Sequence, residues 1–318
     1  MTAGTPFKRE GGLWVPTTRA ERQEQQRLAR YATLTCGMYA WVPGETHPCD
    51  QAGSGVLIAP GLVLTAKHVV DGMATLDARW DPTGPKTQNL NRPQFDIRIY
   101  QAPRFGQDVL WYTTDVWKSK DTDIALLRVR PESEMARWAM GSGALAQAFV
   151  PWRLAPPPVG ERVELYGWPK PGVVNDGGPH TGPVQWVQQE GTVTDVFEPY
   201  RTHGHLDFPC FRIDRPVDGG FSGGPVFYKG ALVGITSISL DTGDATDIER
   251  DAYVASLWPL LLFDVEVDGR RFTFQDRFDY GTIPTVDAPS FRGKVYREPC
   301  DLCSMNDSKH LGHANRKP

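Results

Sequence analysis

Apolar and polar residues alternate in short blocks along most of this chain. Blocks of strand length, bounded by turn residues, favour β-strands over long helices. The segments with this pattern are 32–42, 53–58, 62–68, 95–100, 109–116, 124–129, 161–169, 184–196, 210–213, 226–228 and 231–240. The 32 glycines and 27 prolines supply the turns between them. The pattern predicts an all-β protein.

Three segments depart from the pattern of the other strands. Residues 1–17 have no period and predict a mobile arm or a strap across the surface. Residues 18–30 are strong helix formers with almost no apolar face, which predicts a solvated helix or, alternatively, one that docks on a partner. Residues 263–274 predict a β-hairpin.

The composition is that of an ordinary globular protein. Apolar residues make up 40% and charged residues 23% of the 318 positions, with a net charge of −4. This charge gives no reason to expect a nucleic acid or an anionic membrane as partner. No apolar stretch has the length of a signal peptide or of a membrane span, so we expect neither export nor membrane insertion.

The five cysteines are an odd number in a long chain, unlike the paired frameworks of secreted proteins. They favour a reducing, cytoplasmic location. A disulfide between Cys36 and Cys49 remains an open alternative.

Candidate chemistry begins with a serine set among glycines, in the segment Gly-Gly-Phe-Ser-Gly-Gly-Pro at 219–225. Glycines let the backbone bend sharply and bring N–H groups close to a ligand. A serine becomes a nucleophile only beside a base, which a third group orients. Upstream, His68 follows a short apolar strand, and Asp123 stands at the mouth of the apolar run 124–129. Asp121 is a rival acid two positions earlier.

Three motifs occur in order: Thr-Ala-x-His at 65–68, Asp-Ile-Ala-Leu-Leu at 123–127 and Gly-x-Ser-Gly-Gly-Pro at 220–225. Together they resemble the chymotrypsin-like (trypsin-fold) serine peptidases, whose chain order is His, Asp, Ser, and in particular the bacterial intracellular members. The resemblance implies a His68, Asp123 and Ser222 triad, with the backbone N–H groups of Gly220 and Ser222 as the oxyanion hole.

The resemblance also implies a chymotrypsin-like double barrel, in which two antiparallel β-barrels pack against each other with the catalytic cleft between them. It further implies a C-terminal helix at residues 252–262, whose length Pro259 limits. We place the boundary in a stretch that is helix-friendly at 132–149 and proline-rich from 151. The expected units are an N-terminal arm and helix (1–30), a first barrel with the histidine and aspartate (31–150), a second barrel with the serine (151–262) and a C-terminal extension (263–318).

Phe221 departs from the extracellular members of the family, which carry an aspartate just before the serine. That aspartate pairs with an amino terminus freed by zymogen cleavage, and a phenylalanine cannot form this pair. The departure predicts that the usual activation step is missing. The enzyme would then be constitutively competent or switched by a regulatory protein partner.

The specificity pocket is the least defined part of the resemblance. The position that carries an acid in peptidases specific for basic residues aligns with Pro216, so cleavage after Lys or Arg is not implied. We expect the pocket to accept an apolar or small side chain of the substrate instead. Ser237 and Ser239 would offer backbone groups that pair with an extended peptide.

The tail contains four zinc-capable residues, Cys300, Cys303, His310 and His313. A structural zinc site, an unligated tail and a thiol role are the three interpretations of this cluster. Catalysis of the proposed kind needs no cofactor.

The most favoured function is therefore a cytoplasmic serine endopeptidase that acts on protein or peptide substrates. Gating by a partner would make it an effector in bacterial defence or stress. One alternative is a catalytically silent, protease-like scaffold that binds peptides or protein partners. Another is an esterase, but its nucleophile turn usually leads into a helix, whereas 226–228 continue as strand.

Overall fold

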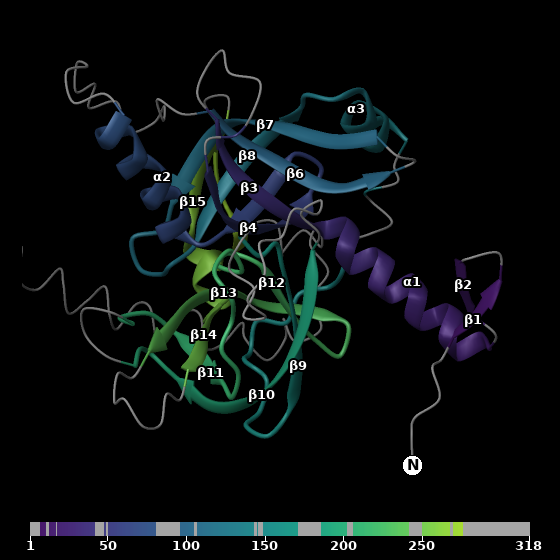
Figure 1. Ribbon diagram of the computed structural model, residues 1–318. Helices are drawn as coiled ribbons and strands as arrows, with labels where there is room; N and C mark the ends of the chain where they lie inside the picture. The colour runs from purple at the N-terminus through teal and green to yellow at the C-terminus, as the bar shows by residue number, and fades with distance from the viewer. Residues whose placement is uncertain are drawn as a thin grey trace, which may run out of the picture.

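Two closed β-barrels, one above the other in Figure 1, form the body of the protein. The computed structural model describes residues 7–10, 13–16, 18–41, 48, 50–80, 96–104, 107–142, 145, 149–170, 186–201, 206–241, 250–267 and 270–275. Each barrel has six strands, and neighbouring strands pair antiparallel. The predicted all-β double barrel is confirmed.

The first barrel closes in the order β3-β4-β5-β8-β7-β6. Its strands are β3 (Thr35–Trp41), β4 (Asp50–Ala59), β5 (Leu62–Thr65), β6 (Asp96–Arg104), β7 (Gln107–Lys118) and β8 (Ala125–Pro131). Strands β4 and β5 form a tight hairpin, because Gly61 adopts a φ of 79° at its turn. This hairpin leads straight to His68.

The second barrel closes in the order β10-β11-β14-β13-β12-β9. Its strands are β9 (Arg162–Gly167), β10 (Val187–Phe197), β11 (Cys210–Ile213), β12 (Pro225–Tyr228), β13 (Ala231–Asp241) and β14 (Arg250–Ser256). Strand β12 is buried along its whole length and begins three residues after Ser222. The serine loop is therefore anchored directly on the barrel.

The predicted C-terminal helix at 252–262 is wrong. Strand β14 occupies its first half and a 3₁₀ helix, η1 (Trp258–Leu262), its second half. Between β11 and β13 this segment gains hydrogen bonds on both edges while Ala252, Tyr253 and Val254 become buried. Tertiary pairing thus overrides the helical preference of the segment.

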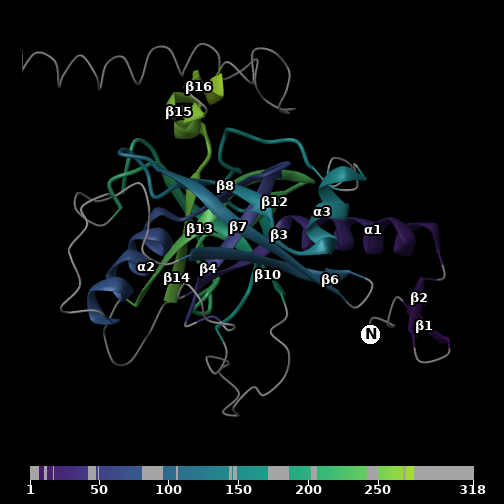
Figure 2. The ribbon, with the colours of Figure 1, turned by 90° about the horizontal axis from the view of Figure 1, so that it is seen from above.

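The terminal segments hold two small hairpins. Strands β1 (Phe7–Glu10) and β2 (Leu13–Pro16) pair antiparallel within the segment expected to be an arm or a strap. Strands β15 (Asp264–Val267) and β16 (Arg270–Thr273) form the hairpin that was predicted near the C-terminal end. Figure 2 shows this second hairpin to one side of the barrels.

Helices are few among the described residues. Helix α1 (Arg19–Leu34) begins with a capping box between Thr18 and Glu21 and runs four residues beyond the predicted helix. Helix α2 (Lys67–Trp80) follows β5 and was not predicted. Helix α3 (Glu134–Gly141) lies within the predicted connection between the barrels. None of the described helices has the length and apolar character that crossing a bilayer requires.

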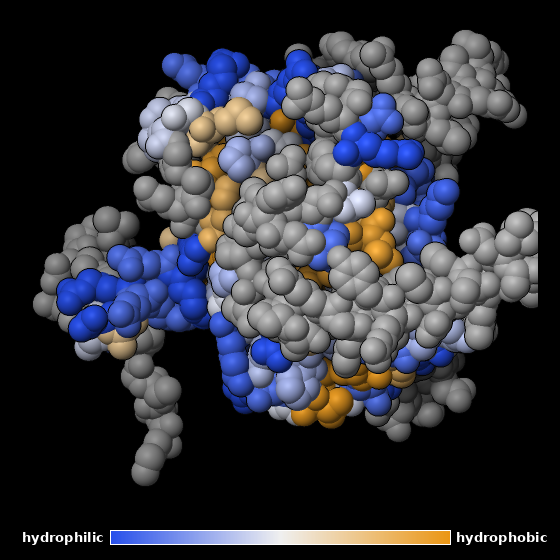
Figure 3. All heavy atoms as spheres, turned by 180° about the vertical axis from the view of Figure 1, so that it is seen from behind, coloured by the Kyte–Doolittle hydropathy of each residue, from blue (hydrophilic) through white to orange (hydrophobic). Residues whose placement is uncertain are grey.

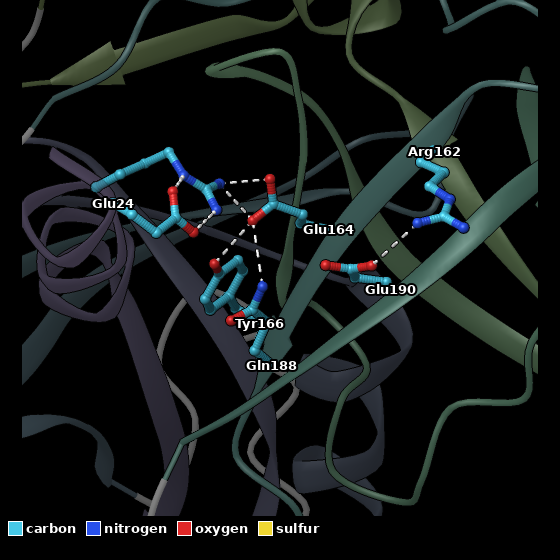
Figure 4. Close-up of polar contacts among 7 residues, drawn as sticks. Glu24, Arg162, Glu164, Tyr166, Gln188 and Glu190 are labelled. Carbon is cyan, nitrogen blue, oxygen red and sulfur yellow. Dashed lines mark hydrogen bonds and ion pairs between the residues drawn. The ribbon is translucent and has the colours of Figure 1, made fainter. Parts of the chain in front are cut away.

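Helix α1 is solvated only along its first half, which projects from the body (Figure 1) and carries mostly hydrophilic side chains (Figure 3). Its second half docks on the barrels, against the prediction that the whole helix is solvated. The Tyr31 ring stacks on Phe227 of β12 with centroids 4.0 Å apart. Arg27 binds the Glu164 carboxylate of β9. Figure 4 shows Glu164 close to Glu24 of the helix and to Tyr166 and Gln188.

Further bonds tie the end of α1 to other parts of the chain. The Arg30 guanidinium donates to the carbonyl oxygen of Phe149, and the Gln101 amide of β6 donates to the carbonyl oxygen of Thr33. Both barrels and the segment between them therefore contact one helix. The apolar character of Tyr31 and Leu34, just past the predicted helix end, explains why the pattern over 18–30 missed this docking.

Candidate active site

His68 lies where β5 gives way to α2. The backbone N–H of Lys67 donates to the carbonyl oxygen of Asp123, 3.2 Å away, which fixes this junction against the start of β8. Val69 and Val70 are buried behind the histidine, whereas its own side chain is 45% exposed. The backbone that carries the imidazole is thus fixed by buried neighbours, while the ring itself is open to solvent.

Asp123 contacts the histidine twice. Its Oδ1 accepts the backbone N–H of His68 at 2.9 Å, and its Oδ2 lies 2.8 Å from the ring Nδ1. Asp121, the rival acid, is exposed, and its backbone N–H donates to the Ser119 hydroxyl. The structure therefore brings Asp123, and not Asp121, onto the ring.

This pairing sets the tautomer of the imidazole. Because Nδ1 faces a carboxylate, Nδ1 carries the proton and Nε2 carries the lone pair. The Asp123 side chain is only 11% exposed, so water competes little for its oxygens. The pair has the arrangement of a general base and its orienting acid.

The serine loop lies in the second barrel and is hydrogen-bonded to strand β4 of the first barrel. The carbonyl oxygen of Ser222 accepts the backbone N–H of Ser54 at 2.7 Å, which joins the loop to β4. The Ser54 hydroxyl donates to the carbonyl oxygen of Gly220 and accepts the backbone N–H of Trp168. Ser54 therefore holds the serine loop against β4 through both its backbone and its side chain. The sequence pattern had marked Ser54 only as part of a strand.

Two glycines of the loop are needed for their backbone geometry. Gly220 has a φ of 100°, and a Cβ there would lie 2.4 Å from the carbonyl oxygen of Trp168. Gly223 has a φ of 85°, and a Cβ there would lie 2.2 Å from the carbonyl oxygen of Ser54. Any other residue would displace the loop at both positions.

The Ser222 hydroxyl donates to the carbonyl oxygen of Ser237, 3.1 Å away. A hydroxyl has one proton, so in this arrangement the proton is directed to Ser237 rather than to the imidazole. The hydroxyl of Ser237 in turn donates to Asp123 Oδ2 at 2.5 Å. Ser237 thus contacts both Ser222 and Asp123.

The contact of the Ser237 hydroxyl with the acid was missed. The sequence pointed to Ser237 only for its backbone groups. Its side chain is 2% exposed on β13, and strand alternation would have placed it inward without naming its acceptor. No signal in the sequence links it to Asp123, which lies 114 positions away.

The predicted oxyanion donors are the N–H groups of Gly220 and Ser222. In the described part of the chain neither N–H is bonded to an acceptor. The neighbouring N–H groups are engaged, since that of Phe221 donates to Asp218 and that of Gly223 to Thr236. Two unengaged donors on one loop are what a developing oxyanion requires.

Phe221 is completely buried. It packs against Gly167 at the end of β9, where a Cβ would come within 2.6 Å of the Phe221 ring. The position thus holds an apolar anchor of the loop.

The remaining predicted site residues make no contact with His68 or Ser222 that the described part of the chain shows. Pro216 is exposed on the segment between β11 and the serine loop. Ser239 pairs with Ala252 across β13 and β14. Cys300, Cys303, His310 and His313 lie outside the described residues, and the described ones contain no group of three potential metal ligands.

The described cysteines do not offer a competing nucleophile. Cys36 and Cys210 are free and completely buried. Burial raises the pKa of the Cys210 thiol to about 12 and shifts that of Cys36 in the same direction. Both stay protonated near neutral pH, and a protonated thiol is a poor nucleophile.

Comparison with protein families identifies one match. The family model of the trypsin-like peptidase domain matches residues 53–235, more than half of the chain. The matched span runs from β4 into β13 and includes His68, Asp123 and Ser222. No curated protein matches the chain.

Solved protease structures are similar at low identity. The active form of the Rv3671c protease from M. tuberculosis is 16% identical, with a TM-score of 0.44, over 80% of this chain and 89% of that one. The apo MamO protease domain from Magnetospirillum magneticum is 16% identical, with a TM-score of 0.47, over 74% of this chain and 97% of that one.

Proposed function

The chain belongs to the trypsin-like peptidase family, and from this premise we propose that it is a serine endopeptidase with Ser222 as nucleophile, His68 as general base and Asp123 as orienting acid. The observation that carries the proposal is the 2.8 Å contact between His68 Nδ1 and Asp123 Oδ2, beside a serine loop that is bonded to the same barrel. A packed structural histidine would not need an exposed ring over a nearly buried carboxylate.

In the proposed first step, Ser222 Oγ attacks the carbonyl carbon of a peptide bond while His68 Nε2 takes the hydroxyl proton. The carbonyl oxygen becomes an anion, which the N–H groups of Gly220 and Ser222 stabilise. His68 then protonates the leaving amine, the C–N bond breaks and an acyl-enzyme forms. Water, activated by His68 in the same way, hydrolyses the ester and restores Ser222.

Asp123 and Ser237 act on the base rather than on the substrate. Asp123 keeps the proton on Nδ1 and stabilises the imidazolium that forms when Nε2 accepts the serine proton. The Ser237 hydroxyl supports Asp123 through its bond to Oδ2. Ser237 is therefore a positioning residue in this proposal.

We further propose that competence depends on a change at Ser222. Its proton is directed to the carbonyl oxygen of Ser237, so the hydroxyl must rotate toward His68 before the attack. A substrate or a regulatory protein partner would supply this change, in keeping with the buried Phe221, which cannot pair with a freed amino terminus. A role in bacterial defence or stress stays a prediction from the sequence.

A proteome-wide cleavage-site profile tests the peptidase proposal. Lysate proteins are incubated with the full-length protein or with its Ser222→Ala variant, and new amino termini are identified by mass spectrometry. We expect new termini only with the wild type. Equal profiles for both proteins, with and without candidate partners from the native host, would reject an endopeptidase.

The second candidate function is a silent scaffold that binds peptides or partners without cleaving them. The orientation of the Ser222 hydroxyl toward Ser237 favours it, because no hydroxyl proton is directed to the base. A scaffold would retain peptides with the same affinity in the wild type and in Ser222→Ala, and would release no fragments.

The proposed catalysis needs no cofactor, because the attacking and proton-transferring groups all come from the chain. The zinc site in the tail stays a separate proposal, tested by metal analysis of the purified protein: stoichiometric zinc that is lost in Cys300→Ser supports it, and its absence rejects it. We also propose a cytoplasmic location, which the free thiols of Cys36 and Cys210 support.

A further inference from the structure

The serine loop contains four consecutive carbonyl oxygens, those of residues 219–222, that all accept hydrogen bonds. Two of the four bonds come from backbone groups close to the loop. The N–H of Lys170 donates to the carbonyl oxygen of Gly219 at 2.8 Å. The N–H of Gly224 donates to that of Phe221, also at 2.8 Å. The other two carbonyl oxygens are bound by a single residue of the first barrel.

Ser54 of strand β4 supplies these two bonds. Its hydroxyl donates to the carbonyl oxygen of Gly220 at 2.6 Å, and its backbone N–H donates to that of Ser222 at 2.7 Å. Gly220 and Ser222 are also the residues whose N–H groups are the predicted oxyanion donors. Ser54 therefore binds both residues of the predicted oxyanion hole, although its own two donors are already engaged.

A fixed carbonyl oxygen also fixes the N–H group that follows it. The peptide group is planar and trans, so the N–H of a residue points opposite to the carbonyl oxygen of the residue before it. Because the carbonyl oxygen of Gly219 faces Lys170, the N–H of Gly220 points away from Lys170. Because the carbonyl oxygen of Phe221 is bound within the loop, the N–H of Ser222 points out of the loop. The peptide group between these two donors is the one that the Ser54 hydroxyl binds.

This peptide group, between Gly220 and Phe221, needs support from outside the loop. Gly220 and the preceding Gly219 lack a Cβ, so rotation about their backbone bonds meets little steric resistance. On its N–H side the peptide group donates to the carbonyl oxygen of Asp218 at 3.1 Å, a longer contact than the 2.6 Å of the Ser54 hydroxyl. Without that hydroxyl, a rotation of this peptide group would turn the oxyanion donors on either side of it.

The Ser54 hydroxyl is itself held in one orientation. Its oxygen accepts the backbone N–H of Trp168 at 2.8 Å, so its single proton is left for Gly220. The residue is 0% exposed, and water does not compete for this bond. The carbonyl oxygen of Ser54 accepts the Thr65 hydroxyl at 2.7 Å, and its strand pairs with Gly37 of β3. Ser54 is thus a fixed donor on a rigid element.

We propose that Ser54 is a positioning residue of the oxyanion hole, whose hydroxyl holds the loop so that the N–H groups of Gly220 and Ser222 stay directed at one substrate oxygen. The inference rests on the proposed peptidase function, since it concerns how that same site is kept competent. Ser54 touches no substrate and transfers no proton. The oxyanion hole of the second barrel thus depends on a side chain of the first barrel.

A pair of esters tests this role directly. 4-Nitrophenyl acetate and 4-nitrophenyl thionoacetate differ only in the atom, oxygen or sulfur, that enters the oxyanion hole, and sulfur is a weak hydrogen-bond acceptor. Release of nitrophenolate by the full-length protein is measured under single-turnover conditions, with Ser222→Ala as background. We expect Ser54→Ala to lower the rate with the oxygen ester about 10²-fold, and the rate with the sulfur ester less than about three-fold. A loss of folded protein, or damage to His68, would lower both rates by the same factor.

Thr35→Val is the matched control. Thr35 is also 0% exposed, and its hydroxyl also donates to a backbone carbonyl oxygen, that of Tyr31 at 2.9 Å. Both variants lose one buried hydrogen bond and should lose similar stability in urea, but Thr35→Val should leave both ester rates as they are. Ser54→Cys keeps a weaker donor and should lower the oxygen-ester rate about ten-fold. It takes the place of Ser54→Ala if the alanine variant does not fold.

The outcomes separate the two proposals. A loss that is much greater with the oxygen ester supports the role of Ser54. A loss that is equal for both esters or greater for the sulfur ester, or no loss at all, overturns that role and leaves the peptidase standing. A wild type that releases nitrophenolate no faster than Ser222→Ala rejects the serine nucleophile, and the role of Ser54 in its reaction with it.

Discussion

Two carboxylates of this protein accept hydrogen bonds from similar sets of donors. They differ in whether a donor has a further atom that can accept a proton. Glu164 on β9 binds Arg27 of α1 and accepts bonds from Tyr166 at 3.0 Å and Gln188 at 3.3 Å (Figure 4). Asp123 binds the ring and the backbone N–H of His68 and the hydroxyl of Ser237.

The difference lies in the donors. Arg27 stays protonated at all accessible pH values, so its bonds with Glu164 can only hold α1 on the second barrel. His68 keeps a second ring nitrogen on an exposed face, and that nitrogen can accept a proton. We infer that the Glu164 cluster serves stability, whereas the Asp123 cluster serves chemistry.

The largest expected effect is a loss of activity when the carboxylate of the Asp123 cluster is replaced, compared with the same replacement in the Glu164 cluster. Asp123→Asn preserves the shape of the side chain but can donate its N–H₂ to the ring, which favours the wrong tautomer of His68. We expect kcat/KM to fall about 10⁴-fold with little change in the urea midpoint. Glu164→Gln is the matched control, and an equal loss of activity in it would contradict the division.

The docking of α1 should appear mainly in stability. Tyr31 is 1% exposed and stacks on Phe227, so Tyr31→Ala leaves a cavity under the helix. We expect a loss of about 3–5 kcal/mol in the free energy of unfolding, measured by urea denaturation. Tyr31→Phe keeps the ring and should lose far less. A similar loss in both variants would show that the ring is not what holds the helix.

Replacing Ser237 tests the contribution of its hydrogen bond to Asp123. Ser237→Ala removes one hydrogen bond to a charged group and leaves the backbone carbonyl that binds Ser222. We expect kcat to fall about 10- to 100-fold with KM nearly unchanged. A rise in KM alone would mean that Ser237 serves substrate binding through β13 and not the orientation of the acid.

The ion pair of the Glu164 cluster should give the smallest effect. A double-mutant cycle with Arg27→Gln and Glu164→Gln should return a coupling of about 1 kcal/mol in the free energy of unfolding, because both side chains are only partly buried. Activity per folded molecule should change less than about two-fold. A large loss of activity would show that the docking of α1 also controls the active site, which contradicts the division between the two clusters.

The two clusters also differ in how far the sequence predicts them. His68, Asp123 and Ser222 lie in short motifs whose order resembles a known family, so the sequence could name His68 and Asp123, which the structure brings together, in advance. Arg27 and Glu164 lie 137 positions apart with no motif at either end. Their contact follows from how α1 packs, which depends on Tyr31 and Leu34 beyond the helical pattern.

Other parts of the fold were missed for similar physical reasons. The strand at β14 contains residues that could form a helix, and its burial between two strands decides the outcome. Helix α2 begins at the histidine motif, where the pattern had indicated only the end of a strand. The pocket beside His68 is lined by segments that converge only in three dimensions.

The central claim, that Ser222 is a nucleophile activated by His68, is tested most directly by a fluorophosphonate probe that forms a covalent bond with an activated serine. Label per molecule is measured by intact mass and located by peptide mapping, for the wild type, Ser222→Ala and His68→Ala. The account predicts one label, on Ser222, in the wild type and none in either variant. A wild type that stays unlabelled in the presence of substrate and host partners, or equal labelling of His68→Ala, would contradict it.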